Sequence, residues 1–224
     1  MSLALSRTIG AYRVHAERRK RPAARRDYGD LLAKVCILAL FSAMSTSIAQ
    51  DFARTGHATG LLLLVSEALV VALTLVRRTA VIVDRSWKAR ILTLLATFGP
   101  PLVRPGGTAV EPELLTVAIS VVGLGIVVMG KLSLGRSFGL TPANRGIVCR
   151  GLYRVVRHPI YLGYLITHLG FLLANPSGWN IAMLVVADVA LTFRAICEEQ
   201  TLAQDPEYRL YMDRVRWRLI PAVF

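Results

Sequence analysis

Hydrophobic residues in this chain gather in long blocks, and polar segments separate one block from the next. The blocks cover approximately residues 31–49, 60–76, 91–103, 113–129, 159–174 and 178–196. A helix of about 20 apolar residues crosses the hydrocarbon core of a bilayer, which is about 30 Å thick. The pattern therefore predicts an all-α fold, a polytopic membrane helical bundle with about six transmembrane segments. Five segments with one re-entrant hairpin is the alternative.

Glycine and proline interrupt or join these blocks. Gly99-Pro100-Pro101 breaks the third block, which predicts a short or kinked span. The tight-turn sequence Asn175-Pro176-Ser177-Gly178 joins the last two blocks and predicts a C-terminal helical hairpin. The polar stretch 131–157 contains several glycines, which do not favour a long regular element. A long loop beside helices is often functional.

Basic residues are distributed unevenly between the polar segments. Segments 1–30, 77–90, 131–157 and 194–224 hold nearly all of the 27 lysines and arginines. The two long intervening loops hold only Arg54 and Arg104. Because cytoplasmic flanks carry the basic excess, both termini and the C-terminal motifs are predicted to be cytoplasmic. We expect a basic cytoplasmic arm at 1–30, N-terminal transmembrane helices at 31–130 and a functional core at 131–224.

Composition narrows the class of protein. The chain is 54% hydrophobic, which is too apolar for an ordinary soluble domain. Its net charge of +13 lies in segments that flank the blocks, so we expect membrane lipids and no nucleic acid as partners. The spacing of Cys36, Cys149 and Cys197 matches neither a disulfide framework nor a zinc site, and we predict no metal site.

Two polar clusters flank the predicted hairpin. Its first arm opens with Arg157-His158-Pro159-Ile160-Tyr161-Leu162-Gly163, where Pro159 suits the first turn of a helix. Arg157 and His158 would lie beside free N–H groups, a position that favours anionic ligand groups. The alternative is an interfacial anchor. The second arm ends in Arg194, Glu198 and Glu199, with Arg194 and Glu198 one helical turn apart. An antiparallel hairpin brings both clusters together, although Arg194 and Glu198 alone would suggest only an ion pair.

The combined motifs resemble the isoprenylcysteine carboxyl methyltransferase family. The resemblance rests on Leu134-Gly135-Arg136-Ser137-Phe138, Gly151-Leu152-Tyr153, Arg157-His158-Pro159-x-Tyr161-x-Gly163, Arg194-x-x-x-Glu198-Glu199-x-x-Leu202, Tyr208 and Tyr211. It covers roughly residues 131–221. It implies an integral membrane methyltransferase that uses S-adenosylmethionine at a cytoplasmic active site.

The resemblance also implies roles for individual residues. The cofactor-binding set would be Tyr153, Arg157, His158, Pro159, Tyr161, Gly163 and Glu199. Arg194 would orient an anionic nucleophile, since a guanidinium grips a carboxylate through two hydrogen bonds. Glu198 would accept a proton if the nucleophile is an amine.

The sequence leaves open the class of methyl acceptor, and it also leaves open two functions without methyl transfer. A lipophilic or lipid-linked carboxylate, such as that of a prenylcysteine-like substrate, is the first hypothesis. Phospholipid amine N-methylation, an NADPH-dependent membrane reductase related in the hairpin region, and a non-catalytic scaffold are the alternatives. Glu67, within the second block, is either functional or a helix contact. His168 is interpreted as a packing partner, with Asp188 across the hairpin.

Overall fold

The computed structural model describes residues 28–57, 59–76, 82–84, 86–106, 108–138 and 142–224. The chain divides into two units, Met1–Cys36 and Ile37–Phe224. Of the first unit, the structure describes only the beginning of helix α2 (Tyr28–Thr55). Most of the predicted basic arm therefore lies outside the described residues. The following description concerns the second unit.

The described residues are mainly helical. The helices after α2 are α3 (Thr59–Val76), α4 (Trp87–Phe98), α5 (Glu113–Leu134), α6 (Pro159–Ala174), α7 (Gly178–Leu202) and α8 (Pro206–Arg214). Short 3-10 helices cover Pro100–Leu102, Gly135–Ser137 and Gly151–Arg154. Strands β1 (Ile82–Val83) and β2 (Ala143–Asn144) form one antiparallel pair, with Ile82 opposite Asn144. The described part of the stretch between α5 and α6 thus contains only short elements, and its glycines predict the lack of a long one.

Local chemistry moves several helix boundaries from their predicted positions. Helix α2 continues to Thr55, so Asp51 and Arg54 are helical rather than part of a loop. Helix α4 begins at Trp87, within the predicted basic loop, because the Ser86 side chain accepts a hydrogen bond from the Ala89 N–H. It ends at Phe98, immediately before the predicted Gly-Pro-Pro break.

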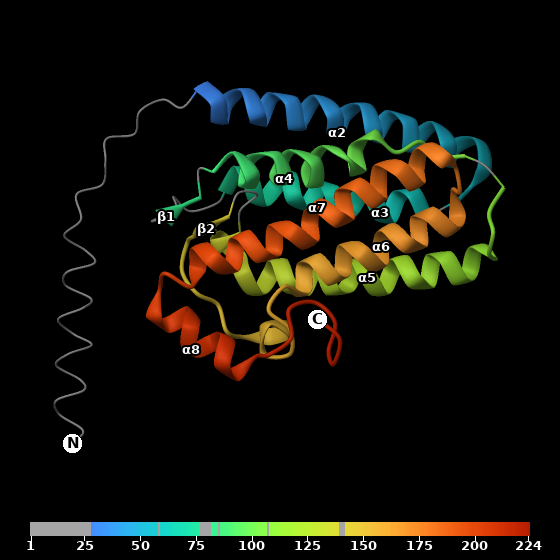
Figure 1. The fold of residues 1–224 in the computed structure, drawn as a ribbon. Helices are drawn as coiled ribbons and strands as arrows, with labels where there is room; N and C mark the ends of the chain where they lie inside the picture. The colour runs from blue at the N-terminus through green and yellow to red at the C-terminus, as the bar shows by residue number, and fades with distance from the viewer. Residues whose placement is uncertain (1–27, 58, 77–81, 85, 107, 139–141) are drawn as a thin grey trace, which may run out of the picture. The chain divides into compact units, whose positions relative to one another are not determined.

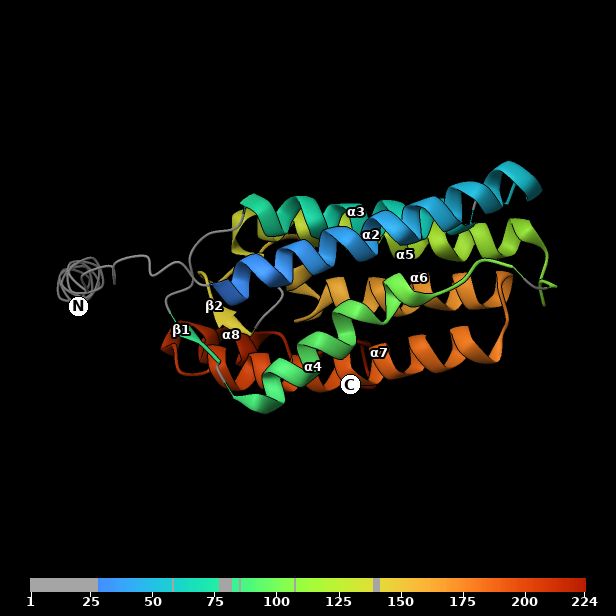
Figure 2. The same ribbon diagram turned by 90° about the horizontal axis from the view of Figure 1, so that it is seen from above.

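The two arms of the hairpin pack mainly on other helices. Helix α6 packs most extensively against α5, and α7 against α4. Seen from above, α6 lies between α5 and α7 (Figure 2). Glycines allow the close approach of α5 and α6: a Cβ at Gly163 would lie 2.8 Å from the backbone oxygen of Gly123, and one at Gly123 would lie 2.5 Å from the Thr167 hydroxyl. The turn therefore connects α6 and α7, while each of these helices packs mainly on a different neighbour.

Asparagines fix the hairpin turn against the loop that follows α4. The Asn180 side chain donates to the backbone oxygens of Arg104 and Asn175, each over 2.8 Å. The Arg104 N–H donates to Asn180 Oδ1 over 2.9 Å, and the Gly106 N–H donates to Asn175 Oδ1 over 2.8 Å. These bonds satisfy backbone groups at the end of the hairpin where α6 and α7 are joined (Figure 1).

Two described helices, α5 and α7, are long and apolar enough to cross a membrane. Helix α6 is also apolar but has 16 residues. Large apolar side chains stand exposed on these helices and on α4, among them Leu94, Leu114, Val122 and Phe193. The count of six spans and the sidedness of the loops remain predictions. The side chain of Glu67, within α3, lies outside the described residues.

Candidate active site

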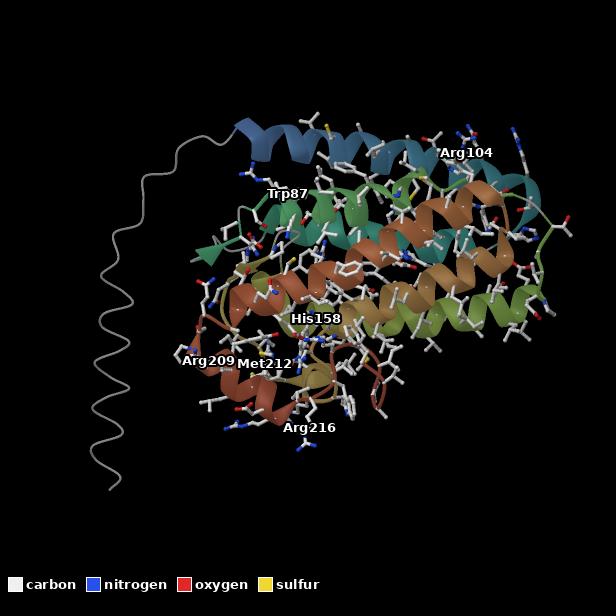
Figure 3. The ribbon with its side chains drawn as sticks, viewed as in Figure 1. Trp87, Arg104, His158, Arg209, Met212 and Arg216 are labelled. Atoms are coloured by element: carbon white, nitrogen blue, oxygen red, sulfur yellow. The ribbon has the colours of Figure 1, made fainter. Side chains whose placement is uncertain are left out.

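The predicted polar clusters lie together where α6 begins and α7 ends. Helix α8 lies at the end where α7 terminates, and the C-terminal segment lies beside the beginning of α6 (Figure 1). Figure 3 shows His158 on the side of Arg209, Met212 and Arg216, with Arg104 toward the other end of the helices. The short turn after α6 reverses the chain, and this reversal places residues nearly 40 positions apart within hydrogen-bond distance.

Tyr161 links the two arms through its hydroxyl. This hydroxyl donates to Glu198 Oε2 over 2.6 Å and accepts from Arg194 Nε over 3.0 Å and from Arg194 Nη2 over 2.8 Å. The Arg194 guanidinium also lies over the Tyr161 ring, 4.8 Å from its centroid. Arg194 is only 4% exposed, so this contact satisfies a guanidinium that is almost fully removed from solvent. We call these three residues the tyrosine clamp.

Glu199, on the next position of α7, gathers three cationic or imidazole groups. Arg157 grips its carboxylate through two bonds, from Nε over 2.6 Å and from Nη2 over 3.3 Å. His158 Nε2 lies 3.2 Å from Oε1, and Arg218 Nε donates to Oε2 over 2.8 Å. The Glu199 side chain is buried, and both of its carboxylate oxygens are bound by these neighbours. It therefore links the start of α6 to the C-terminal segment.

The C-terminal segment is bound to the start of α6. The N–H groups of Arg157 and His158 donate to the backbone oxygens of Trp217 and Arg218, over 2.9 and 2.8 Å. Arg157 Nη1 donates to the backbone oxygens of Val215 and Arg216. The position at the start of α6 that was expected to bind an anionic ligand group is therefore occupied by the protein's own groups. Glu199 is the anion beside Arg157 and His158. The physical reason is that the tail returns to this end of the hairpin, which spacing alone does not reveal.

Three tyrosines form an aromatic wall beside the clamp. Tyr153 lies in the 3-10 helix before α6, and Tyr208 and Tyr211 lie in α8. The Tyr211 hydroxyl donates to the Tyr153 backbone oxygen over 2.7 Å. Burial raises the pKa of each phenol. The Glu198 carboxylate raises the pKa of Tyr153 further, and the Glu199 and Glu198 carboxylates raise that of Tyr208. The phenols are therefore neutral at physiological pH.

A first cavity opens in front of this wall, with about 700 Å³ of empty space that is partly open to solvent. Aromatic and apolar residues supply most of its lining, including Leu134, Phe138, Ile147, Val148, Tyr153, Leu202, Tyr208 and Tyr211. Its polar lining includes Ser137, Arg145, Arg157, His158, Tyr161 and Glu198.

A second cavity lies on the other side of the tyrosine clamp, with about 460 Å³ of empty space. Helices α4, α6 and α7 form its walls, and Arg194 faces it. Tyr161 and Phe138 line both cavities, so these two residues separate them. Because α6 packs on α5 and α7 packs on α4, the two arms of the hairpin leave room for this space.

The structure divides the residues predicted from the sequence among four places. The first cavity is lined by Tyr153, Arg157, His158, Tyr161 and Glu198. Arg194 faces the second cavity, and Glu199 lies behind His158. Pro159 begins α6, and Gly163 packs against Gly123 and Val127 of α5. Neither Pro159 nor Gly163 lines either cavity. His168 and Asp188 lie 2.6 Å apart, which confirms the predicted pair across the hairpin.

Several residues of the site escaped the sequence analysis. Arg218 binds Glu199, but its sequence context does not distinguish it from the other tail arginines. Lys131 is completely buried, with Nζ 4.8 Å from the centroid of the Tyr164 ring. From the sequence, it was assigned only to the basic segment 131–157. Arg145 lines the first cavity but belongs to none of the motifs. Only its position in a glycine-rich loop pointed to a functional role.

An apolar helical hairpin with a buried polar cluster at its open end is a candidate functional site, because ionisable groups among apolar helices are costly. Residues 112–205, less than half of the chain, match the family described as phospholipid methyltransferase. This match confirms the predicted resemblance, because isoprenylcysteine and phospholipid methyltransferases belong to one group of integral membrane enzymes. The matched part runs from the N-cap of α5 to the N-cap of α8, so it contains the hairpin and the tyrosine clamp. No curated protein matches the chain.

The first cavity fits S-adenosylmethionine, the methyl donor generally used in this family. Its aromatic wall suits an adenine ring and a sulfonium. Glu198 provides a carboxylate for an ammonium or for ribose hydroxyls, and Arg145 and His158 provide groups for a carboxylate. The Tyr161 hydroxyl is already engaged by Arg194 and Glu198, so Tyr161 would contribute its ring.

Proposed function

We propose that this protein transfers a methyl group from S-adenosylmethionine to a lipophilic or lipid-linked acceptor, at a cytoplasmic active site in the membrane. The observation that carries the proposal is the position of the tyrosine clamp between two cavities. Glu198 faces the first cavity, which suits a polar cofactor, and Arg194 faces the second, which lies between apolar helices. In this arrangement the cofactor arrives from the cytoplasm and the acceptor from the bilayer.

Methyl transfer is a direct displacement at carbon, so catalysis depends mainly on alignment of the nucleophile, the methyl carbon and the sulfur. Bound S-adenosylmethionine supplies an electrophilic methyl group. The chain's own contribution is to bind the cofactor along the tyrosines, to orient the acceptor with Arg194 and to separate the two compartments with Tyr161 and Phe138. Exclusion of water from the site would strengthen the electrostatic attraction between Arg194 and an anionic acceptor group.

A carboxylate is the acceptor group that Arg194 favours, as in a prenylcysteine-like substrate. A carboxylate needs no general base, because it is already ionised. The family match gives a second candidate, the amine of a phospholipid. In that reaction Glu198 would accept the proton, since it receives a hydrogen bond from Tyr161 and is held as an acceptor. Arg194 could then bind the phosphate of the same lipid.

Detergent-purified protein can test the proposal directly. Binding of radiolabelled S-adenosylmethionine is measured beside binding of NADPH, which separates a methyltransferase from a membrane reductase. Incubation with total membrane lipid extract, followed by mass analysis, identifies the methylated product and distinguishes an ester from an N-methyl amine. Folded protein that binds no S-adenosylmethionine would contradict the proposal. Binding of NADPH alone would favour the reductase.

A further inference from the structure

The wall of the second cavity carries polar groups that the proposed methyl transfer does not use. His168 of α6 and Asp188 of α7 both line it and contact each other directly, with Nδ1 and Oδ1 2.6 Å apart. Thr97 of α4 lines the same cavity. His168 Nε2 and the Thr97 hydroxyl are both buried and have no hydrogen-bond partner among the described residues. The polar groups of this cavity are therefore only partly satisfied.

The contact with Asp188 determines what His168 presents to the cavity. A carboxylate at this distance accepts the Nδ1 proton, so the neutral imidazole has an unprotonated Nε2. The ring is also held by Tyr164, which stacks on it with 5.9 Å between the centroids. In this neutral tautomer, Nε2 is a hydrogen-bond acceptor on a side chain that lines the second cavity. A role in helix packing alone would explain the Nδ1 contact but would leave Nε2 without a function.

We propose that the second cavity binds the body of an amphiphilic acceptor that carries an O–H or N–H group, and that His168 Nε2 accepts a hydrogen bond from this group. This inference rests on the proposed function, because it assigns a substrate feature to the acceptor compartment. Asp188 is a positioning residue that fixes the imidazole tautomer. His168 determines specificity, because an acceptor without the donor would leave a buried nitrogen unpaired.

The position of His168 along α6 defines where the donor lies in the acceptor. His168 follows Tyr161 by two helical turns, which is a rise of about 10 Å at about 1.5 Å per residue. Arg194 lies at the Tyr161 end of the cavity, while Asp188 lies toward the turn. The acceptor would therefore present its methylated group near Arg194 and its O–H or N–H group several bonds farther along its chain.

Two matched probes can test the hydrogen bond without requiring enzymatic activity. 1-Octanol and octyl methyl ether share an apolar chain, but only the alcohol can donate. The full chain is labelled with ¹⁵N-histidine and purified in a detergent that has no O–H or N–H group. The four histidines give few signals, and His168→Phe assigns the signal of His168.

We expect 1-octanol to shift the His168 Nε2 signal and to half-saturate at a concentration about fivefold lower than the ether, because one hydrogen bond contributes about 1 kcal/mol. Because the two variants lack the His168 signal, equilibrium dialysis of the radiolabelled probes compares them with the wild type. The preference should disappear in His168→Phe and return in part in His168→Gln, whose side-chain amide offers an oxygen near the same position. Equal effects of both probes on the wild-type protein would overturn the inference. A preference unchanged in His168→Phe would do the same.

Measurements on the same samples separate this inference from the proposed function. S-Adenosylmethionine affinity should be unchanged in His168→Phe, because His168 does not line the first cavity. Cofactor binding and methyl transfer without any preference for the alcohol would contradict only the role of His168. A preference for the alcohol in a protein that binds no cofactor would contradict only the methyltransferase proposal.

Discussion

The hydroxyl of Tyr161 donates a hydrogen bond to Glu198 over 2.6 Å, and this bond joins the start of α6 to the end of α7. The same oxygen accepts two bonds from Arg194, which lies one helical turn before Glu198. The two charged residues are thus connected through a neutral phenol that belongs to the other arm. One side chain therefore determines the position of both candidate catalytic residues.

Replacement of Tyr161 by phenylalanine should uncouple these two residues. The ring remains, but Arg194 and Glu198 lose their common partner. We expect turnover with lipid extract to fall by about 100-fold, because small displacements of reacting groups have effects of that size. S-Adenosylmethionine affinity should change much less, which equilibrium binding measures. Thermal melting checks that the variant is folded, and near-normal turnover in a folded variant would remove the clamp from the mechanism.

Glutamine variants at Arg194 and Glu198 should distinguish the two acceptor classes. For a carboxylate acceptor, Arg194→Gln should raise KM and lower kcat/KM by about 100-fold, since hydrogen bonds to charged groups contribute about 1.5–3 kcal/mol each. For an amine acceptor, Glu198→Gln should lower kcat most and flatten its dependence on pH. Arg209→Gln serves as a control, because Arg209 is exposed on α8. Equal loss of kcat/KM in Arg209→Gln would show that the effect is not specific to the site.

Glu199 should contribute mainly to stability. It binds Arg157, His158 and Arg218 within a buried cluster, so Glu199→Gln removes the only anion among them. Removing one partner of a buried pair typically costs about 3–5 kcal/mol, and we expect an effect near the lower end because glutamine keeps the shape. Thermal melting measures the loss. Trypsin should also cut the C-terminal segment faster, because Arg218 loses its partner.

Glu207→Gln provides the matched control for this variant. Glu207 is an exposed carboxylate in the first turn of α8. Exposed substitutions usually change stability by no more than about 0.5 kcal/mol. If Glu199→Gln melts like Glu207→Gln and resists trypsin like the wild type, Glu199 does not hold the tail.

The arrangement of the hairpin and its ends could be predicted from the sequence to a large extent. The turn at Asn175-Pro176-Ser177-Gly178 determines that the chain reverses, and helical spacing puts Arg194 and Glu198 on one face. The pairing of His168 with Asp188 followed from the same reversal. These features depend on local chemistry and on one short connection, both of which are visible in a single sequence.

The role of each site residue depended on packing that spacing does not encode. Gly163 was predicted to let the cofactor approach closely, but the side where a Cβ would lie faces α5. Glu199 was predicted to bind the cofactor, but the returning tail places Arg218 on it and Arg157 and His158 complete its shell. Both outcomes depend on which helices neighbour α6 and α7, and on where residues 215–224 return. Such contacts join segments far apart in the sequence.

Cysteine labelling should test the predicted sidedness. Cys149 is exposed in the loop between α5 and α6, and Thr108 is exposed in the loop before α5. In sealed vesicles, a membrane-impermeant maleimide should reach Cys149 from the cytoplasmic side and Thr108→Cys from the opposite side. The background is Cys36→Ser with Cys197→Ser, and Cys149→Ser is added for the Thr108→Cys variant. Labelling of both positions from one side would contradict a spanning α5.

The same cysteine gives a prediction for pH. Partial burial of its sulfur raises the pKa of Cys149, the nearby Glu207 raises it further and Arg214 opposes this. Because the thiolate is the reactive form, labelling at pH 7 should be slower than for an unperturbed cysteine and should rise with pH through the raised pKa. Glu207→Gln removes one cause of the rise, so it should speed labelling at fixed pH. Unchanged rates between the two proteins would contradict this electrostatic contribution.

Two glycine-to-alanine variants should show that the contact of α5 with α6 keeps the tyrosine clamp in position. A Cβ at Gly163 would lie 2.7 Å from Val127 Cγ2 and 2.8 Å from the Val127 nitrogen, so the helices must separate. Such overpacking typically costs about 1–3 kcal/mol. Gly125, on the partner helix α5, has no neighbouring atom within 4 Å of an added Cβ, and alanine there should be neutral or stabilising by up to about 1 kcal/mol.

The displacement in Gly163→Ala should also reach Tyr161, which lies two residues earlier on α6. We therefore expect Gly163→Ala to lower both the melting temperature and turnover, whereas Gly125→Ala lowers neither. Tyr161→Phe, by contrast, should lower turnover more than stability, because it leaves the helix contact intact. If Gly163→Ala melts and turns over like Gly125→Ala, the two helices do not need their close approach. The position of the clamp would then depend on α7 and the C-terminal segment instead.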